Sequence, residues 1–387
     1  MIGIRLWENK AECTACGACV QICKTDAISF IEDEYGFRFP VIDPLKCVEC
    51  RNCEKICPVK QHKEKSERQP KIYAVRHKDK AVRLKSSSGG AFTVLLETIV
   101  PDIVYGAAFT EDMQVRHRSA VTPEEVDLLR GSKYVQSDTG KTFIDVKEKL
   151  NEGKKILYIG TPCQIAGLKA FVGKEVPNLY TGDLVCEGVQ SQSFFNRYLK
   201  YMEEKHRSKA KSVEFRNKEH FGWERSEFMI MFKNGKKYVQ ISQTKDSAYM
   251  NSFLFQGGCR DSCYQCPFAC MPRQGDFTLA DLWGWKDITP DWKDNTGISL
   301  LLCNTEKAQQ YIGKMKKVAD VREITLEQAK RQNPNLVKPA PEPERRKEYL
   351  EDMKTLSFAE LEAKWLRPRS WLRKKIGVLK FVLTRSM

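Results

Sequence analysis

The chain has 387 residues, of which 41% are hydrophobic and 30% charged, and its formal net charge is +15. This length exceeds that of one small domain and predicts two or three folded units with an ample core. No stretch approaches the roughly 20 consecutive apolar residues of a membrane span, and the first ten residues lack the apolar core of a secretory signal. Fifteen cysteines without an export signal indicate metal sites in a reducing compartment. We therefore expect a cytoplasmic protein from an organism that lives largely without oxygen.

The excess positive charge is scattered along the chain, with local clusters at 205–211, 233–237, 314–317 and 367–375. None of these clusters is interleaved with the stacking aromatic residues of a nucleic-acid motif, so we expect no nucleic-acid binding. A basic surface suits an acidic electron carrier such as a ferredoxin, because complementary charge accelerates the encounter of two proteins.

Residues 1–60 contain two runs of four cysteines, each with the spacing C-x2-C-x2-C-x3-C. Bacterial ferredoxins bind two [4Fe-4S] clusters with this spacing, and the fourth cysteine of each run binds the other cluster. One predicted ligand set is Cys13, Cys16, Cys19 and Cys57, and the second is Cys47, Cys50, Cys53 and Cys23. Zinc sites or disulfides are the competing interpretations, but zinc knuckles use pairs of C-x2-C units. Short strands are expected at 27–31 and 37–42, and a polar linker at 61–70.

Strands and helices follow one another from residue 71 onward. Predicted strands lie at 72–76, 103–109, 155–159, 179–185 and 298–303, and predicted helices at 124–129, 142–150 and 193–206. The segments 228–233 and 236–242 flank Asn234-Gly235 and predict a hairpin. The sequence S-S-S-G-G (86–90) leads into a helix, and a helix N-terminus after such a loop favours a phosphate. A serine cap followed by a glycine turn is the purely structural alternative.

Two cysteines follow predicted strands of this α/β pattern. Cys163 comes after the strand 155–159 and a glycine turn, and Cys186 ends the strand 179–185. Functional groups of open α/β sheets gather at this edge, although a free cysteine can also be a small buried hydrophobe. Four more cysteines lie within 259–270 and argue for a metal site. The pair Cys263-x2-Cys266 would supply half of a site that is completed from elsewhere.

The last part of the chain is basic and proline-containing. Four prolines between 330 and 344 close the domain, and a charged helix is expected at 345–364. In the segment 371–383, apolar residues recur at helical spacing among basic ones. Such a tail can lie on an anionic membrane surface or pack on its own protein, so peripheral contact with the inner face of the membrane remains an alternative.

In this order the motifs resemble a known family. The ferredoxin runs are followed by S-S-G-G, G-S-K-Y-V-Q-S, G-T-P-C-Q, D-L-V-C, S-C-Y-Q-C and L-A-D-L-W-G. Together they resemble the beta subunit of coenzyme F-420-reducing hydrogenase and formate dehydrogenase, with a dicluster ferredoxin fused in front. The resemblance covers residues 1 to about 303, and the stretch F-R-N-K-E-H-F-G-W (215–223) is most similar to members encoded in bacterial polysaccharide loci.

The resemblance implies a fold of α+β and α/β class in four parts. A ferredoxin-like dicluster domain (1–60) and a linker (61–70) precede an α/β domain with a mixed sheet (71–335). That domain is expected to bind FAD and one further [4Fe-4S] cluster. A proline-rich linker and a basic helical tail (336–387) follow it.

The resemblance also implies the ligands of these groups. The third cluster is expected at Cys163, Cys186, Cys263 and Cys266, with Cys259 or Cys270 as an alternative for one of them. The flavin-binding role carries over to Ser87, Ser88, Gly89, Gly90, Gly131, Ser132, Lys133, Tyr134, Thr161 and Asp281. Candidate ligands of an anionic substrate are Lys133, Arg216, Lys218 and His220. The alternative for Arg216 and Lys218 is that they are solvated charges.

The implied activity is that of an iron–sulfur flavoprotein oxidoreductase. Clusters carry single electrons, whereas a flavin can deliver a pair as hydride. We expect electrons to pass between ferredoxin and FAD through three [4Fe-4S] clusters, and on to an organic substrate such as an anionic nucleotide sugar or polysaccharide precursor. The alternative is an electron-transfer subunit that links a hydrogenase or formate dehydrogenase to a deazaflavin coenzyme; an iron–sulfur redox sensor is a third possibility. The sequence names no catalytic proton donor and leaves the oligomeric state open, with a homo-oligomer among the alternatives.

Overall fold

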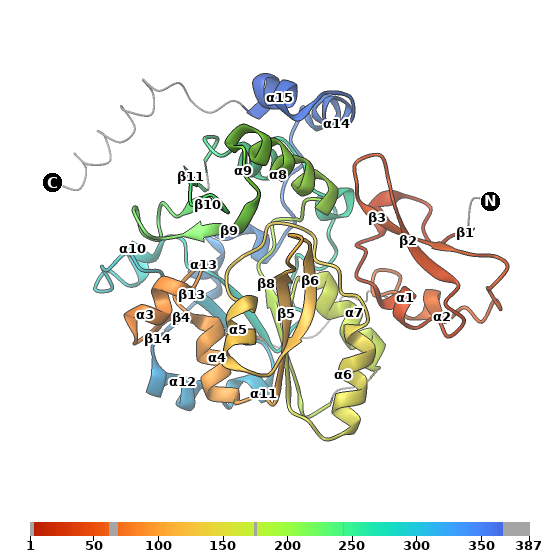
Figure 1. The fold of residues 1–387 in the computed structure, drawn as a ribbon. Coiled ribbons are helices and arrows are strands. Elements are labelled where there is room, and N and C mark those ends of the chain that lie inside the picture. Colours follow the sequence, from red (N-terminus) through yellow and green to blue (C-terminus); the bar gives the residue numbers. More distant parts are fainter. Residues whose placement is uncertain (1–3, 62–68, 174–175, 243, 367–387) are drawn as a thin grey trace.

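The computed structural model describes residues 4–61, 69–173, 176–242 and 244–366. The N-terminal domain has a three-stranded antiparallel sheet in the order β1-β3-β2 and two short helices. Its elements are β1 (Ile4–Arg5), α1 (Ala18–Gln21), β2 (Ile28–Glu32), β3 (Arg38–Ile42) and α2 (Asn52–Lys55). The two strands expected at 27–31 and 37–42 are thus confirmed, and they pair with each other. Figure 1 shows this domain, in red, beside helices α6 and α7 of the main domain.

The main domain is built on an eight-stranded mixed sheet in the order β14-β4-β13-β12-β8-β7-β5-β6. Its strands are β4 (Lys71–His77), β5 (Ile103–Phe109), β6 (Val115–Ala120), β7 (Ile156–Gly160), β8 (Leu179–Leu184), β12 (Phe277–Asp281), β13 (Ser299–Cys303) and β14 (Ala319–Ile324). The four central strands β5, β7, β8 and β12 run parallel, and the outer pairs are antiparallel. The expected α/β class with a mixed sheet is therefore confirmed.

Helices cover both faces of this sheet (Figure 1). On β7, Leu157 packs with α4 and α12, whereas its neighbour Tyr158 packs with α6 and α7. Successive side chains of a strand point to opposite faces, so a strand buried on both sides reads as the continuous apolar run seen here. The helices of the domain are α3 (Lys80–Lys85), α4 (Ala91–Ile99), α5 (Pro123–Leu129), α6 (Thr142–Asn151), α7 (Pro162–Val172), α10 (Trp285–Ile288), α11 (Glu306–Gln309), α12 (Ile312–Val318) and α13 (Leu326–Lys330).

A smaller antiparallel sheet with helices packs above the main sheet (Figure 1). Its elements are α8 (Gln192–His206), β9 (Ala210–Asn217), β10 (Glu227–Phe232), β11 (Lys237–Ile241) and α9 (Ala248–Phe255). The predicted hairpin is confirmed, since β10 pairs with β11 across a turn in which Gly235 has a φ of 83°. Phe195, Phe228 and Tyr249 are completely buried in the shared core.

The single charged helix expected at 345–364 is a wrong prediction. The structure has α14 (Arg346–Thr355), α15 (Phe358–Leu361) and a π-helix (Glu362–Leu366). Ser357 interrupts the chain because its hydroxyl accepts from Glu360 N at 3.3 Å while the Glu360 carboxylate accepts from Ser357 N at 2.8 Å, which caps a new helix. The segment also packs into the core of the smaller sheet, as the burial of Tyr349 and Phe358 shows. The amphipathic stripe expected at 371–383 lies outside the described residues.

The N-terminal domain is fixed to the main domain by several polar contacts. Gln136 Nε2 donates to Thr14 O at 3.0 Å, and Thr139 Oγ1 donates to Cys16 O at 3.1 Å. At Gly167 of α7, a Cβ atom would lie 3.0 Å from Cys16 Sγ, so this helix offers room for the cysteine loop only because it has no side chain here. The loop that carries Cys16 therefore sits directly on the helix that begins beside Cys163.

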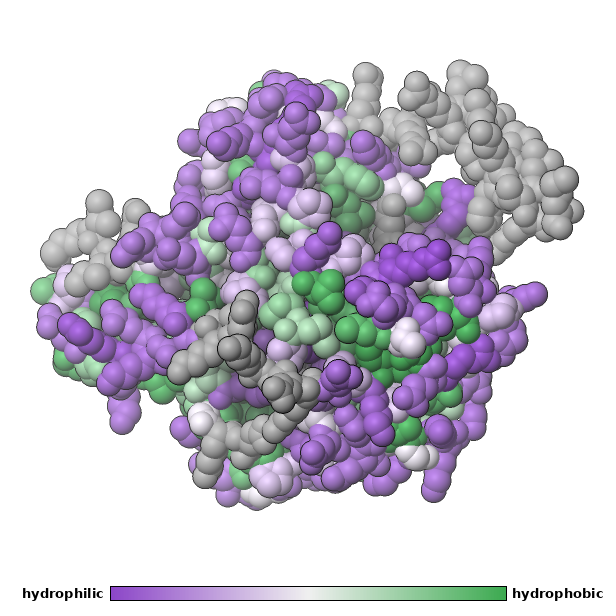
Figure 2. All heavy atoms as spheres, turned by 180° about the vertical axis from the view of Figure 1, so that it is seen from behind, coloured by the Kyte–Doolittle hydropathy of each residue, from purple (hydrophilic) through white to green (hydrophobic). Residues whose placement is uncertain are grey.

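The surface is mainly hydrophilic. On the face drawn in Figure 2, hydrophilic side chains predominate, and hydrophobic ones gather in patches toward the middle. Within the described residues, every helix is too short or too polar to span a bilayer.

Candidate functional site

The two cysteine loops of the N-terminal domain have the same backbone conformation. Ala15 and Gly17 in the first loop have φ values of 51° and 89°, and Glu49 and Arg51 at the equivalent positions of the second have values of 53° and 57°. Left-handed residues alternating with right-handed ones turn backbone N–H groups toward one side, a concavity that suits anions and iron–sulfur clusters. Three of these four residues are not glycine, and such conformations persist where function requires them.

The thiols of the first predicted ligand set lie close together. Burial raises the pKa of Cys19, and the neighbouring charges of Cys13 and Cys57 raise it further. Burial likewise raises the pKa of Cys16, with Cys19, Cys163 and Cys13 as its charged neighbours. Cys163 belongs to the main domain, so the first site adjoins the thiols of that domain. In the second set, Cys50 is exposed and Cys53 is its neighbour.

A cavity of about 330 Å³ opens at the carboxyl ends of β7 and β8, a volume within the usual range of ligand sites. Residues far apart in the sequence meet around it. Nine of the ten residues predicted to bind the flavin line it, namely Ser87, Ser88, Gly90, Gly131, Ser132, Lys133, Tyr134, Thr161 and Asp281. Gly89 does not line it. Thr14 of the N-terminal domain also contributes to the wall.

All four thiols predicted for the third cluster line this cavity, namely Cys163, Cys186, Cys263 and Cys266. Burial raises the pKa of Cys186 well above its ordinary value, and the charges of Cys263 and Cys163 act in the same direction. Cys259 and Cys270, the alternatives for one ligand, are not part of the lining. Cys259 is buried, with its thiol 3.7 Å from Phe253 O, and Cys270 Sγ lies 3.1 Å from Pro267 O.

The cysteine sites suit a cluster better than a single ion. In the described residues, no three His, Cys, Asp or Glu side chains converge as the ligands of one metal ion would. A cubane is held at its corners by four separate thiolates, so its ligands surround a volume instead of a point. The left-handed loops and the grouped, buried thiols fit that requirement.

The serine–glycine loop forms one wall of the cavity. Ser87 Oγ accepts from Ser132 N at 2.8 Å and thereby joins the loop to the segment G-S-K-Y. Gly89 lies against the sheet, where a Cβ would stand 2.5 Å from Val75 O, so any other residue would push the loop away. The following helix α4 starts at the cavity with Gly90 at a φ of 90°. Its free N–H groups can bind an anionic group such as a phosphate.

Lys133 lies in the cavity wall, but its ammonium group is committed to backbone carbonyls. Its Nζ donates to Leu128 O, Leu129 O and Arg130 O at 2.8–3.1 Å, at the carboxyl end of α5. Burial lowers the pKa of Lys133 to about 7. The side chain therefore anchors the loop 131–137 to the helix, and all three of its donors are used.

Arg216 lies behind the cavity wall. Its Nη1 contacts Asp281 Oδ2 at 2.8 Å and Tyr134 Oη at 3.4 Å, and both partners line the cavity. Trp223 Nε1 donates to the other oxygen of Asp281 at 2.6 Å, and its ring stacks on Trp283. Burial opposes the charge of Arg216, but Asp281 prevails and raises its pKa above the ordinary value. Arg216 is buried, so it is no solvated charge, and it supports the wall from behind.

The other two substrate candidates do not line the cavity. Lys218 is buried and donates to Arg83 O, Ser88 O and Thr296 O at 2.6–2.8 Å, which ties the serine–glycine loop to neighbouring segments. Burial lowers its pKa to about 7. His220 has a largely exposed ring that lies 2.9 Å from the Glu227 carboxylate, and this partner raises its pKa.

Sequence reasoning missed several side chains in the cavity wall. His117, Glu187, Arg260 and Arg273 line it. Arg260 adjoins Cys259 in the cysteine-rich segment, which was the available signal. The other three belong to no motif in the sequence, and only the packing of distant strands and loops brings them to the site.

Comparison with known proteins agrees with these sites. Residues 153–329 match the family model for the C terminus of the coenzyme F420 hydrogenase/dehydrogenase beta subunit, and residues 12–61 match the 4Fe-4S dicluster domain. The first match contains the four thiols of the cavity, and the second contains all eight cysteines of the N-terminal domain.

Individual relatives match parts of the chain. One subunit of the F420H2 dehydrogenase of Methanosarcina mazei is 27% identical over 170 residues, which are 39% of this chain and 46% of that protein. The chain thus covers less than half of that relative. A ferredoxin-like protein in the nif region of Rhizobium leguminosarum bv. trifolii is 42% identical over 55 residues, 13% of this chain and 78% of that protein. A chain of the F420-reducing [NiFe] hydrogenase complex from Methanosarcina barkeri superimposes with a TM-score of 0.45 at 16% identity, over 78% of this chain and 94% of that one.

The cysteine loops, the cavity thiols and the two family models lead to one assignment. The chain belongs to the family of coenzyme F420 hydrogenase/dehydrogenase beta subunits and carries a 4Fe-4S dicluster domain at its N-terminal end.

Proposed function

We propose that this protein is an iron–sulfur flavoenzyme that transfers electrons between ferredoxin and an organic substrate. Cys163, Cys186, Cys263 and Cys266 would hold a third [4Fe-4S] cluster, and the serine–glycine loop with the G-S-K-Y segment would hold FAD. Bound there, the clusters supply one-electron transfer and the flavin supplies the exchange between single electrons and hydride.

One observation carries the proposal. The cavity is lined at the same time by the four thiols and by nine of the ten residues predicted to bind the flavin. Cys16 of the N-terminal domain has Cys163 as a charged neighbour, so the dicluster domain adjoins the same cavity. This arrangement supports a continuous path between an external electron carrier and a bound organic molecule.

The residues of the wall have distinct parts in this proposal. The N–H groups at the start of α4 would bind the phosphates of the cofactor, because a helix N-terminus favours anions. Lys133 and Lys218 fix the two segments that carry these groups, since each ammonium bonds to three carbonyl oxygens. Arg216 holds the Asp281 carboxylate in place at the opposite wall.

Metal and flavin analysis of anaerobically purified protein tests the proposal. We expect about twelve irons, with matching acid-labile sulfide, and one FAD per chain. Cys266→Ser should remove about four irons, because this thiol lines the cavity. Cys270→Ser is the matched control and should keep them all, since Cys270 lies four residues away and outside the lining. Eight irons without flavin in the unaltered protein would refute the proposal.

A second candidate follows from the similarity to the F420H2 dehydrogenase of Methanosarcina mazei. In this alternative the chain is an electron-transfer subunit that passes electrons between a partner enzyme and a deazaflavin coenzyme. The two candidates differ in their electron exchange: the isolated protein should be reduced by ferredoxin in the first and by a reduced deazaflavin in the second. Rapid reduction by the deazaflavin, with none by ferredoxin, would favour the second.

A further inference from the structure

Five arginine side chains are buried in the described part of the chain, namely Arg83, Arg216, Arg260, Arg273 and Arg346. Four of them have a carboxylate partner: Arg83 with Asp294, Arg216 with Asp281, Arg273 with Asp183, and Arg346 with Asp261. Arg260 is the most deeply buried of the five, with 1% of its surface exposed. Among the described residues, no carboxylate lies within ion-pair distance of it.

The side chain of Arg260 crosses from the cysteine-rich segment of the main domain to the N-terminal domain. Its Nε donates to Cys13 O at 2.7 Å, and its Nη1 lies 3.4 Å from Gln136 Oε1. The guanidinium group stacks over the Phe39 ring at 4.0 Å, and Nη2 is buried without a hydrogen-bond partner. Every contact of this cation is therefore with a neutral group.

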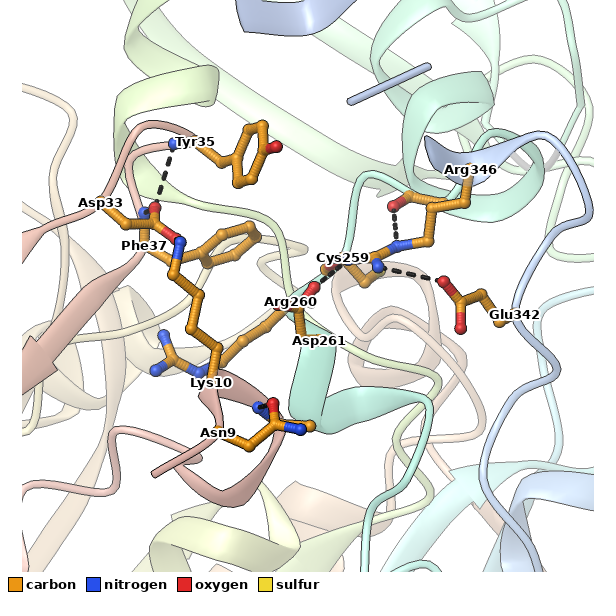
Figure 3. A network of polar contacts seen from close by, with 12 residues as sticks. Asn9, Lys10, Asp33, Tyr35, Phe37, Cys259, Arg260, Asp261, Glu342 and Arg346 are labelled. Carbon is orange, nitrogen blue, oxygen red and sulfur yellow. Dashed lines mark hydrogen bonds and ion pairs between the residues drawn. The ribbon is translucent and has the colours of Figure 1, made fainter. Parts of the chain in front are cut away.

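The nearby carboxylates are already paired with other cations (Figure 3). Asp33 accepts from Lys10 Nζ at 2.9 Å and from the backbone N–H groups of Tyr35 and Phe37. Asp261, the next residue in the chain, turns away from Arg260 and pairs with Arg346 at 2.5 Å. Neither acid can neutralise the Arg260 guanidinium without giving up these bonds.

A buried charge without a counter-charge costs several kcal/mol, so a negative group is needed near Arg260. The groups that remain are the cysteine thiolates on either side. Burial raises the pKa of both Cys13 and Cys163, and in each case the Arg260 charge opposes that rise. Arg260 thus lies between a thiol of the N-terminal domain and a thiol of the cavity, and acts on both.

We propose that Arg260 is the counter-charge of the iron–sulfur sites that include Cys13 and Cys163, and that it raises their reduction potentials. The part that concerns Cys163 rests on the third cluster of the proposed function. Reduction of such a site by one electron adds one negative charge to it. A fixed positive charge in a medium of low dielectric constant stabilises that reduced form. Arg260 is a positioning residue, because it acts through the thiolate sites and touches no reacting atom.

Redox titration of full-length variants, monitored by electron paramagnetic resonance with dithionite as the reductant, tests this proposal. In Arg260→Gln, the potentials of the sites at Cys13 and Cys163 should become more negative. A tenfold smaller equilibrium constant for one-electron reduction corresponds to about 59 mV. Arg260→Lys keeps the charge and should restore most of the shift. The site of Cys47, Cys50 and Cys53 is the internal reference and should not move.

Arg38→Gln is the matched control for a merely structural effect. Arg38 forms an ion pair with Asp138 across the same domain interface, at 2.7 Å, but is partly exposed. Its loss should leave all potentials unchanged. A shift in Arg38→Gln as large as that in Arg260→Gln would overturn the proposal, as would unchanged potentials in an Arg260→Gln protein with full iron content.

A second variant decides the matter if Arg260→Gln does not accumulate. Gln136→Glu places a carboxylate beside the guanidinium and neutralises it without removing it. It should produce a negative shift of the same sites, and unchanged potentials in this variant would also refute the proposal. If the unaltered protein holds only the two N-terminal clusters, the proposed third cluster fails, whereas the shift at the Cys13 site still tests the role of Arg260.

Discussion

His117 lies on β6 within the cavity wall, where its ring is buried and stacks on Tyr158. Nε2 donates to Ile159 O at 3.0 Å, which leaves Nδ1 to accept from Ser137 Oγ at 2.6 Å in the neutral ring. Burial lowers the pKa of His117 to about 4. One neutral side chain thus holds together two segments of the wall, the end of β7 and the loop before α6.

This burial predicts an acid-sensitive contribution to stability. The folded pKa lies below the ordinary value of about 6.5, so the unfolded chain binds the proton more readily. The contribution is complete above pH 6.5 and is lost as the pH falls toward 4; at pH 5 the loss is on the order of 2 kcal/mol. His117→Gln should therefore lose less stability than the unaltered protein between pH 7 and pH 5, as measured by urea unfolding.

His220 provides the control for this experiment. Its exposed ring has a raised pKa because of Glu227, so its contribution is present at low pH and lost as the pH rises. His220→Gln should change the pH dependence slightly in the opposite direction. Equal acid losses in the unaltered protein and in His117→Gln would contradict the assignment of a buried neutral imidazole.

At the scale of elements, local signals predicted most of the structure around the cavity. Thr161 and Pro162 begin α7 directly after β7, and the predicted strand–turn–helix placed Cys163 at the sheet edge as the structure has it. Strands β6 and β14 were not predicted, because charged residues on their exposed faces obscure the alternation. β14 lies at the edge of the sheet and pairs only with β4, far away in sequence. No local pattern encodes such a pairing, nor the meeting of Arg260 with Cys13.

The start of α7 is expected to control the geometry of Cys163. Thr161 N donates to Gln164 Oε1 at 3.0 Å, and Thr161 Oγ1 lies 3.2 Å from Cys163 Sγ. Thr161→Ala should cost about 1 kcal/mol of unfolding free energy, the usual value of a helix cap, and should also lower the iron content of the purified protein.

Thr122→Ala is the matched control, because α5 begins with the same Thr-Pro pair and the same reciprocal cap. It should have a similar effect on urea unfolding but leave the iron content intact. If both variants retained iron equally, Thr161 would be only a cap.

At the scale of the whole molecule, the N-terminal domain presents its second cysteine set to the outside. Cys50 is the exposed cysteine of the chain, whereas Cys16 is buried against α7. An external carrier can therefore approach the Cys50 loop but not the Cys16 loop. The basic net charge of +15 suits an acidic carrier.

Cys50→Ala should accordingly disconnect the protein from ferredoxin. We expect the loss of about four irons and of reduction by ferredoxin, with flavin binding unchanged. Cys303→Ala removes a thiol that is fully buried on β13 and outside both cysteine loops, and should preserve the iron content and the reduction. Persistence of ferredoxin-driven reduction in Cys50→Ala would place the entry point elsewhere.

The contact between Cys16 and Gly167 also bears on how the two domains work together in time. Proteins that ferry electrons on a tethered domain must wait for that domain to diffuse between docking positions. Here α7 carries no side chain at Gly167, Thr139 and Gln136 bond to the backbone of the cysteine loop, and Arg260 bonds to Cys13 O. The N-terminal domain is consequently a stationary terminal, and the separation between its thiols and those of the cavity is a constant of the fold. Solvent viscosity then acts on the encounter with the external carrier and has no moving part to slow inside the molecule.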